Sequence, residues 1–224
     1  MKFAIAVLLT VGLLGRGVDA AGGASKPSPS ANSGPSLEEE AVKHYNDGLK
    51  HRDKAWEHEE KAAAAKKQKE GDKYLKKAKK EYEKAAKDQL KATQKNSRFH
   101  EAFTSLGYAY RKVGEYEEAL RAYDRALELN PNYTEAIEYR AEAYLGLNRI
   151  VEAQAAYEKL FTRDPKRAGP LLAAVKQWVE WRAGTPVAEI SAATLKEVGD
   201  WIVAKEKTAA EMGGTGEQGN KEWR

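Results

Sequence analysis

The chain of 224 residues contains no cysteine, which excludes disulfide bonds, thiolate zinc sites and cysteine nucleophiles. Histidine is scarce as well, with 4 residues, and no Gly-x-Ser-x-Gly elbow, glycine-rich phosphate loop or His-Glu-x-x-His helix occurs. Catalysis needs a nucleophile or base that a partner group holds in place, and no such pair stands out. The sequence therefore predicts a protein that is not an enzyme and has no cofactor.

Charged residues are abundant instead, at 32% of the chain, whereas aromatic residues make up only 9%. Ala, Glu, Lys, Leu and Arg dominate, a composition typical of long helices or helical repeats. The long Val, Ile and Leu runs of a buried parallel sheet are missing. The composition thus favours an all-α fold.

The first 20 residues differ from the rest and have the pattern of a secretory signal peptide. Lys2 supplies the positive start, residues 3–14 form an apolar run, and small residues precede a cleavage site after Ala20. This run is too short to span a bilayer, which needs about 20 residues. The pattern predicts a secreted or periplasmic protein from which residues 1–20 are removed.

Residues 21–36 consist mainly of Gly, Ser, Pro and Ala, so they are expected to form a disordered linker. Ser36 and Glu39 then form the pattern of a capping box, which predicts that a helix begins at this point. Residues 213–224 are again poor in apolar side chains, and the tail from 212 to 224 is predicted to be disordered.

Two long helices are predicted between the linker and Asn96. The first runs to about Glu70 and the second ends near Asn96, with Gly71-Asp72 expected to break the chain between them. Because they are similar in length and closely joined, they predict an antiparallel hairpin over residues 37–99. Their expected apolar stripes are Leu37, Ala41, Tyr45, Leu49 and Trp56, then Leu75, Ala78, Tyr82, Ala85 and Ala92.

Beyond Asn96 the chain repeats itself with a period of 34 residues, marked by Asn96-Ser97, Asn130-Pro131 and Asp164-Pro165. Fixed positions recur in register within this period. Residues 100–133 carry Phe103, Leu106, Gly107, Tyr110, Ala119, Tyr123, Ala126 and Pro131. Residues 134–167 carry Ile137, Ala141, Tyr144, Ala153, Tyr157, Leu160 and Pro165, with Arg140 in place of the leucine.

This period and these residues resemble the tetratricopeptide repeat family. The resemblance implies a right-handed superhelical stack of helix–turn–helix units, in which small residues such as Gly107 let helices approach closely. Residues 37–99 resemble a degenerate first repeat, because Gln89 stands where an aromatic residue belongs and Ser97 where proline does. Residues 168–211 are expected to form C-terminal capping helices in which tryptophans serve packing.

The resemblance also implies a groove lined by the first helix of each repeat. The residues at those places are Glu101, Thr104, Ser105, Tyr108 and Arg111, then Glu135, Glu138, Tyr139, Glu142 and Leu145. Family members that clamp a terminal carboxylate use lysine, asparagine and arginine there, so this sequence favours a basic or mixed peptide or protein partner. The alternative that the C-terminal helices fill the groove stays open, and the pattern specifies neither the partner nor an oligomeric state.

A cluster of lysines lies where the hairpin turns. Its members are Lys66, Lys67, Lys69, Lys73, Lys76, Lys77, Lys79 and Lys80, called the lysine arm below. The main hypothesis is a non-enzymatic adaptor of the cell envelope, and the alternative is docking of this arm on an anionic membrane surface or polymer. Lysine is also a good helix former that keeps helices soluble. Nucleic acid is disfavoured, because no binding motif occurs and the chain carries an export signal.

His44, His51 and His58 recur every seven residues along the first predicted helix. Two helical turns separate neighbours by about 10.5 Å, too far for two of them to share a metal ion. Only a pair such as Asp47 and His51 is close enough, and two ligands make a weak site. The spacing therefore predicts a solvated helix face and no metal site.

Overall fold

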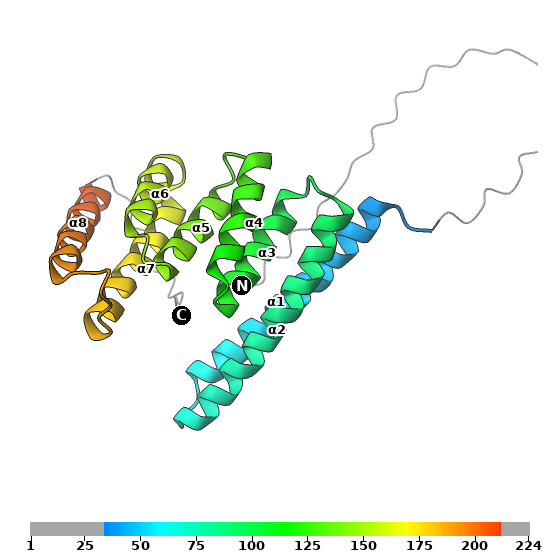
Figure 1. The fold of residues 1–224 in the computed structure, drawn as a ribbon, viewed down its shortest axis with the longest axis horizontal. Helices are drawn as coiled ribbons and strands as arrows, with labels where there is room; N and C mark the ends of the chain where they lie inside the picture. Colours follow the sequence, from blue (N-terminus) through cyan, green and yellow to red (C-terminus); the bar gives the residue numbers. More distant parts are fainter. Residues whose placement is uncertain (1–33, 212–224) are drawn as a thin grey trace, which may run out of the picture. The chain divides into compact units, whose positions relative to one another are not determined.

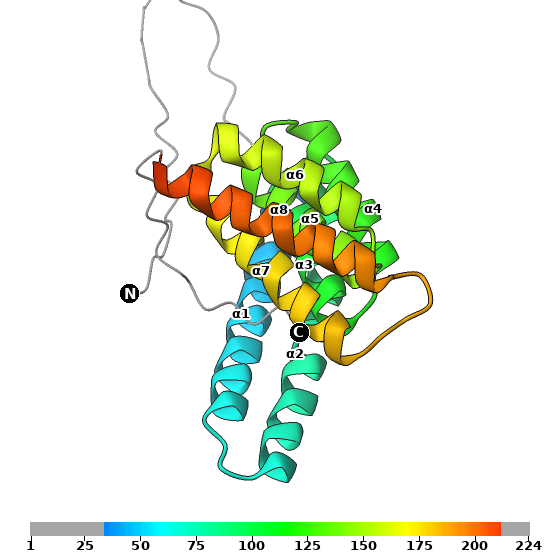
Figure 2. The ribbon, with the colours of Figure 1, turned by 90° about the vertical axis from the view of Figure 1, so that its left-hand side faces the viewer.

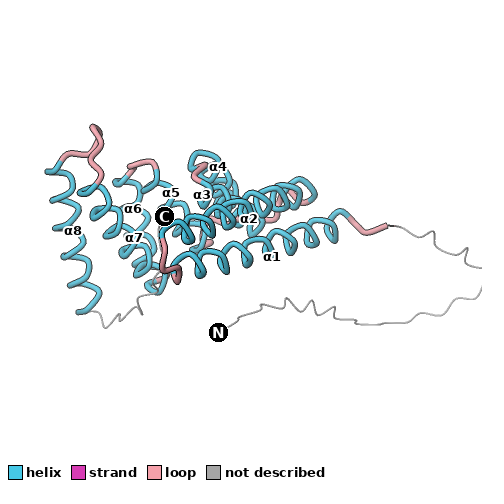
Figure 3. Tube along the Cα trace, turned by 90° about the horizontal axis from the view of Figure 1, so that it is seen from below, coloured by secondary structure: helices cyan, strands magenta, loops and turns pink. Residues whose placement is uncertain are grey.

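The computed structural model describes residues 34–211 (Figure 1). The predicted signal peptide, most of the predicted linker and the predicted tail lie outside these residues. The described part forms eight α-helices and no strand, so the all-α prediction is confirmed (Figure 3). The helices are α1 (Leu37–Ala63), α2 (Gln68–Lys95), α3 (His100–Val113), α4 (Tyr116–Leu129), α5 (Thr134–Gly146), α6 (Ile150–Arg163), α7 (Pro165–Gly184) and α8 (Ala192–Glu211).

The helices form a stack of antiparallel pairs, α1–α2, α3–α4, α5–α6 and α7–α8 (Figures 1 and 2). Each pair also packs against the next, through α2 and α3, α4 and α5, and α6 and α7. The first helices of the pairs are neighbours as well, since α3 contacts α1 and α5, and α5 contacts α7. We call the surface formed by α1, α3, α5 and α7 the A-helix face.

The close approach of α3 to α4 depends on Gly107. A Cβ atom there would lie 2.6 Å from Cε1 of the Tyr123 ring, well inside van der Waals contact. Tyr123 is fully buried, as are Ala119 and Ala126 on the same helix. The equivalent small residue of the next pair, Ala141, is also completely buried. Small residues at these positions therefore permit the packing that the repeat pattern predicts.

A residue in the left-handed backbone conformation follows the first helix of both repeats. Gly114 follows α3 with φ 92°, and Asn148 follows α5 with φ 61°, a conformation that glycine and asparagine adopt most readily. The Asn148 side chain has a second role, because its Oδ1 accepts a hydrogen bond from Arg182 Nε at 2.8 Å. This bond ties the turn of one helix pair to α7 of the next.

The hairpin begins as predicted but turns earlier. Ser36 and Glu39 form the expected capping box at the start of α1. However, α1 ends at Ala63 and α2 begins at Gln68, so the prediction of a break at Gly71-Asp72 was wrong. Gly71 lies in the first turn of α2, where an added Cβ would lie 3.4 Å from the Ala62 carbonyl oxygen. An added Cβ would therefore make only an ordinary contact with α1, and Gly71 neither ends a helix nor reverses the chain.

Gln89, which departs from the repeat pattern, takes the place of the aromatic residue in three dimensions. Its side chain is 1% exposed, and its Nε2 donates a hydrogen bond to the Tyr45 carbonyl oxygen at 3.0 Å. A Cβ at Gly48 would lie 2.4 Å from the same nitrogen. The hairpin therefore repeats the contact between a small and a large residue that Gly107 and Tyr123 make.

The expected apolar stripes of the hairpin are only partly buried. Ala41 and Ala55 of α1 are fully buried, but Leu37 is 63% and Trp56 is 38% exposed, and Leu75 of α2 is 49% exposed. The buried contact between α1 and α2 pairs small residues of α1, Gly48 and Ala55, with Gln89, Ala78 and Tyr82 of α2. Leu37, Trp56 and Leu75 lie outside this contact and stay exposed. None of the described helices is both long and apolar enough to cross a membrane.

The C-terminal helices continue the stack. Pro165 occupies the first turn of α7, where its missing N–H costs no hydrogen bond. Trp178 is fully buried, and the Trp201 ring packs edge-on against Tyr157 at 5.1 Å between centroids, which agrees with a packing role for tryptophan. Because α7 packs beside α5 and α6, and α8 packs on α7, these helices lengthen the row.

We expect Gly107→Ala to lower the free energy of unfolding by about 1–3 kcal/mol, because the buried Tyr123 ring must move to admit a methyl group. Urea denaturation followed by circular dichroism measures this change. Gly199→Ala is the matched control, since nothing lies within 4 Å of its added Cβ in α8. There we expect a gain of about 0.5–1 kcal/mol from helix propensity. Equal stability of the Gly107 variant and the wild type would contradict this account of the packing.

Candidate functional site

The residues predicted to line a groove do lie on α3 and α5, but half of them are buried. Thr104, Arg111, Glu138 and Glu142 are each at most 7% exposed. Glu101 and Glu135 keep 41% and 31% of their side chains exposed, and Tyr108 and Tyr139 are partly buried. Leu145 is buried as well, so the expectation that all ten side chains are available to a ligand is corrected.

Arg111 and Glu142 bind each other across the α3–α5 contact. The Arg111 Nη1 to Glu142 Oε2 distance is 2.6 Å, and both side chains are at least 93% buried. The guanidinium also lies over the Tyr108 and Tyr139 rings, at 5.1 and 5.6 Å from their centroids. Burial alone lowers the pKa of Arg111, but Glu142 and nearby tyrosines together raise it above its usual value. This pair holds the two helices together and is not offered to solvent.

Arg167, at the start of α7, binds three carboxylates. Its guanidinium lies 2.5 Å from Glu138, 3.4 Å from Glu135 and 3.7 Å from Asp164. Asp164 accepts a further hydrogen bond from the Thr134 hydroxyl at 2.8 Å. Glu138 is therefore a buried part of the contact between α5 and α7, whereas Glu135, Asp164 and Arg167 each keep about 30% of their side chains exposed.

An aromatic band runs across the A-helix face and joins α1, α3 and α5. Trp56 Nε1 donates a hydrogen bond to the Tyr108 hydroxyl at 2.8 Å, and the Tyr108 ring lies 5.1 Å from that of Tyr139. Arg52 stacks over Trp56 at 4.3 Å and pairs with Asp53. We call Trp56, Tyr108 and Tyr139 the aromatic band. It combines exposed apolar area with hydrogen-bonding groups, as binding surfaces commonly do.

Trp56 is the member of this band that sequence reasoning missed. Its position near every fourth residue of the first helix placed it on the expected core stripe. The structure turns it toward α3, where it meets Tyr108 from 52 positions away. No local pattern signals this contact. The one feature of the sequence that could have indicated it is the size of Trp56, a large aromatic residue next to the small Ala55 that lies in the helix contact.

A cleft of about 770 Å³ lies between the end of the hairpin and α7. Ala62, Ala65 and Leu75 line it from the hairpin, and Glu180 and Trp181 line it from α7. Neither α1 nor α2 packs against α7 in the described part of the chain. The cleft exists because the hairpin is longer than the other helix pairs (Figures 1 and 2), a consequence that the sequence did not reveal.

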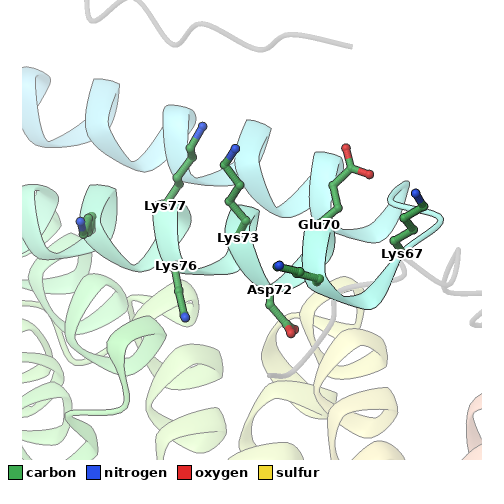
Figure 4. Close-up of a pocket in the computed structure, with 8 residues that line it drawn as sticks. Lys67, Glu70, Asp72, Lys73, Lys76 and Lys77 are labelled. Atoms are coloured by element: carbon green, nitrogen blue, oxygen red, sulfur yellow. The ribbon is translucent and has the colours of Figure 1, made fainter.

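The lysine arm lies on the turn before α2 and on its first half. All eight lysines are exposed, and no carboxylate of residues 34–211 lies within ion-pair distance of any of them. Figure 4 shows Lys73 and Lys77 on one side of α2 and Lys76 on another. Lys69, Lys73, Lys76 and Lys80 also line a shallow hollow of about 740 Å³ along this helix. The positive charge therefore surrounds the end of the hairpin.

Two of the three spaced histidines, His51 and His58, take part in contacts within the hairpin, so the prediction of a solvated helix face is wrong for them. His51 Nδ1 lies 2.6 Å from Glu81 Oε2, and the His58 ring stacks on Tyr74 at 6.2 Å. Within residues 34–211, no cluster of three or more histidine, aspartate or glutamate residues has an arrangement that could hold a metal ion. His51 thus links α1 to α2, a contact that helical spacing alone did not suggest.

Comparison with known proteins matches one of the two repeat units. The family described as "Tetratricopeptide repeat" matches residues 100–133. No curated protein matches the chain. A crystal structure of MamA is 22% identical, with a TM-score of 0.41 over 62% of this chain and 80% of that one. A second crystal structure, of MamA protein, is 22% identical, with a TM-score of 0.42 over 77% and 95%.

The matched unit is the one in which Gly107 packs on Tyr123, and helix pairs of the same kind precede and follow it. Residues 100–133 therefore form a tetratricopeptide repeat, a helical unit that is typical of scaffolds for protein–protein interaction.

Proposed function

We propose that this protein is a non-enzymatic adaptor that binds a peptide or protein segment along its A-helix face. The observation that carries the proposal is the aromatic band, in which Trp56 is 38% exposed beside the partly buried Tyr108 and Tyr139. Tryptophan and tyrosine are enriched among the residues that dominate binding energy in interfaces. The hairpin–α7 cleft continues the apolar surface through Leu75 and Trp181.

The buried pairs beneath this surface support the same function. Arg111–Glu142 joins α3 to α5, and Arg167–Glu138 joins α5 to α7. Removing one partner of a fully buried pair such as Arg111–Glu142 typically costs about 3–5 kcal/mol, so this pair resists separation of α3 from α5. Arg167 is 30% exposed, so its pair with Glu138 contributes less. A surface held in this way loses little conformational entropy when it binds, which favours affinity.

Trp56→Ala is expected to weaken binding of selected peptides at least tenfold, because it removes the most exposed side chain of the aromatic band; a central tryptophan is worth about 2 kcal/mol or more. The peptides are dodecamers enriched from a random phage-displayed library on the full chain, and calorimetry measures their Kd. Val151→Ala, at a residue 70% exposed on α6, is the control. Equal affinity of all three proteins for every enriched peptide would overturn the proposed surface.

A second candidate function is docking of the lysine arm on an anionic membrane surface or polymer. The eight lysines without acidic partners favour it, since paired charges would be partly neutralised. Each lysine near an anionic lipid surface contributes about 1 kcal/mol, and salt screens this attraction. Because the lysines point to different sides of α2, the end of the hairpin is better suited to contact the anionic surface than any single side of the helix (Figure 4).

Replacement of Lys69, Lys73, Lys76 and Lys80 by glutamine is expected to reduce binding to phosphatidylglycerol-containing vesicles at least tenfold. Vesicle sedimentation at low and high salt measures the effect, with phosphatidylcholine vesicles as the uncharged surface. The control replaces Lys43, Lys50, Lys166 and Lys196, exposed lysines elsewhere, and removes the same net charge. Loss of binding in both variants alike would mean that net charge alone acts, and the arm would have no special role.

We further propose that the adaptor acts outside the cytoplasm, in a cell envelope or after secretion. Support comes from the signal-peptide pattern of residues 1–20, which lie outside the described part of the structure. Expression of the full chain in a bacterium with a periplasm, followed by N-terminal sequencing, tests the proposal. We expect a mature chain that begins at Ala21, and an uncleaved chain in the cytoplasm would contradict it.

A further inference from the structure

The lysines of α2 have different surroundings in the two halves of the helix. In the second half, three of them form ion pairs: Lys84 with Glu81, Lys91 with Asp88 and Lys95 with Glu40. In the first half, the lysine arm is exposed and has no ion-pair partner within residues 34–211. Helix formation and solubility are equally well served by paired lysines. They do not explain why the charge is left unpaired in only one half of the same helix.

The positive charge of the lysine arm is concentrated in a short stretch. Residues 66–80 contain eight lysines and only two carboxylates, those of Glu70 and Asp72. Asp72 accepts a hydrogen bond from Gln68 Nε2 at 2.9 Å instead of pairing with a lysine. The formal charge of the whole chain is +4, which is less than the excess within this stretch. Six of the lysines line the hollow of about 740 Å³ along α2, where such a concentration of charge attracts anions (Figure 4).

The lysine arm is too long for all of it to meet a bilayer at the end of the hairpin. From residue 67 to residue 80 the helix rises by about 20 Å, whereas salt screens charges beyond about 8 Å under physiological conditions. Four members lie about 12–18 Å from the start of α2, and we call them the distal lysines: Lys76, Lys77, Lys79 and Lys80. A bilayer at the end of the hairpin therefore attracts the lysines near the turn much more than the distal lysines.

A bilayer along one side of α2 also reaches only part of the lysine arm, because Lys73 and Lys77 lie on one side of the helix and Lys76 on another (Figure 4). A flexible linear polymer has neither restriction. It can follow Lys69, Lys73, Lys76 and Lys80, which are about 4.5–6 Å apart along the helix axis, and bend toward the lysines beside them. The arrangement thus fits a chain of anions better than a flat anionic surface.

We propose that the lysine arm binds a flexible linear polyanion that lies along the first half of α2 and contacts the distal lysines. The inference rests on the second candidate function, and it selects the polymer over the membrane. Residues 66–80 contain no arginine, so bidentate recognition of one kind of anion is missing, and lysine acts as a point charge. Affinity therefore depends on the length and charge density of the polymer more than on the chemical type of its anions.

The test measures binding of long-chain inorganic polyphosphate to the full chain by calorimetry at several salt concentrations. For single-stranded nucleic acid, each neutralised charge contributes about 0.7 to the slope of log K against log salt, and we take the same value for polyphosphate. Replacement of the four distal lysines by glutamine should therefore lower the slope by about 3 and weaken binding at least tenfold at low salt. Tripolyphosphate is too short to span the arm and should bind weakly to both proteins.

The matched control replaces Lys43, Lys50, Lys166 and Lys196 by glutamine, which removes the same net charge from exposed sites elsewhere. We expect this control to bind long-chain polyphosphate with the slope of the wild type. Glutamine is a good helix former, and thermal unfolding verifies that both variants fold. An equal slope for the distal variant and the wild type, or an equal loss in the control, would overturn the inference.

Phosphatidylglycerol-containing vesicles, tested on the same proteins, separate this inference from the function on which it rests. We expect the distal substitutions to weaken vesicle binding less than polyphosphate binding, because a bilayer at the end of the hairpin lies far from these lysines. A wild type that binds vesicles but not polyphosphate would overturn the inference and leave membrane docking intact. If the wild type binds neither, docking by the lysine arm fails as a function and the inference fails with it.

Discussion

The architecture depends on one packing constraint, the contact of a small residue on one helix with a large side chain on its partner. Gly107 against Tyr123 sets the distance between α3 and α4, and Gly48 against Gln89 does the same within the hairpin. Protein interiors are packed so densely that an added methyl group has no free volume to enter. With the spacing inside each pair fixed, the first helices of successive pairs come to lie beside one another.

The ion pairs on the A-helix face form because the first helices of successive pairs lie side by side. Hydrogen bonds between successive pairs join residues 28 to 34 positions apart, as for Arg167 with Glu138 and Arg182 with Asn148. Charges that look independent along the sequence therefore meet and neutralise each other inside the stack. The aromatic band and two of the predicted groove residues, Glu101 and Glu135, remain accessible to solvent. The face is thus divided into an interior that holds the helices and a surface that a partner can contact.

Sequence reasoning succeeded where the determinants are local. The capping box at Ser36 and the fixed positions of residues 100–133 involve residues close in the chain, and both were found. It failed where a distant partner decides, as for Trp56, which meets Tyr108 from 52 positions away. The burial of Glu138 is an intermediate case. Its partner Arg167 is brought near by the 34-residue repeat period, and that period was recognised in the sequence. The early turn of the hairpin was missed because Gly71 resembles a helix breaker but lies inside the first turn of α2.

The length of the hairpin has an electrostatic consequence of its own. Ala55, Ala78 and Tyr82 form a small buried cluster between α1 and α2, against which Tyr108 and Val113 of α3 pack, and the lysine arm lies beyond it toward the turn. Eight like charges crowd this end, and their mutual repulsion opposes the compact state. Counterions, or any polyanion that gathers there, relieve the repulsion and tighten the helices. Order at the end of the hairpin is therefore coupled to the ionic surroundings, whereas the buried Arg111–Glu142 pair between α3 and α5 is shielded from them.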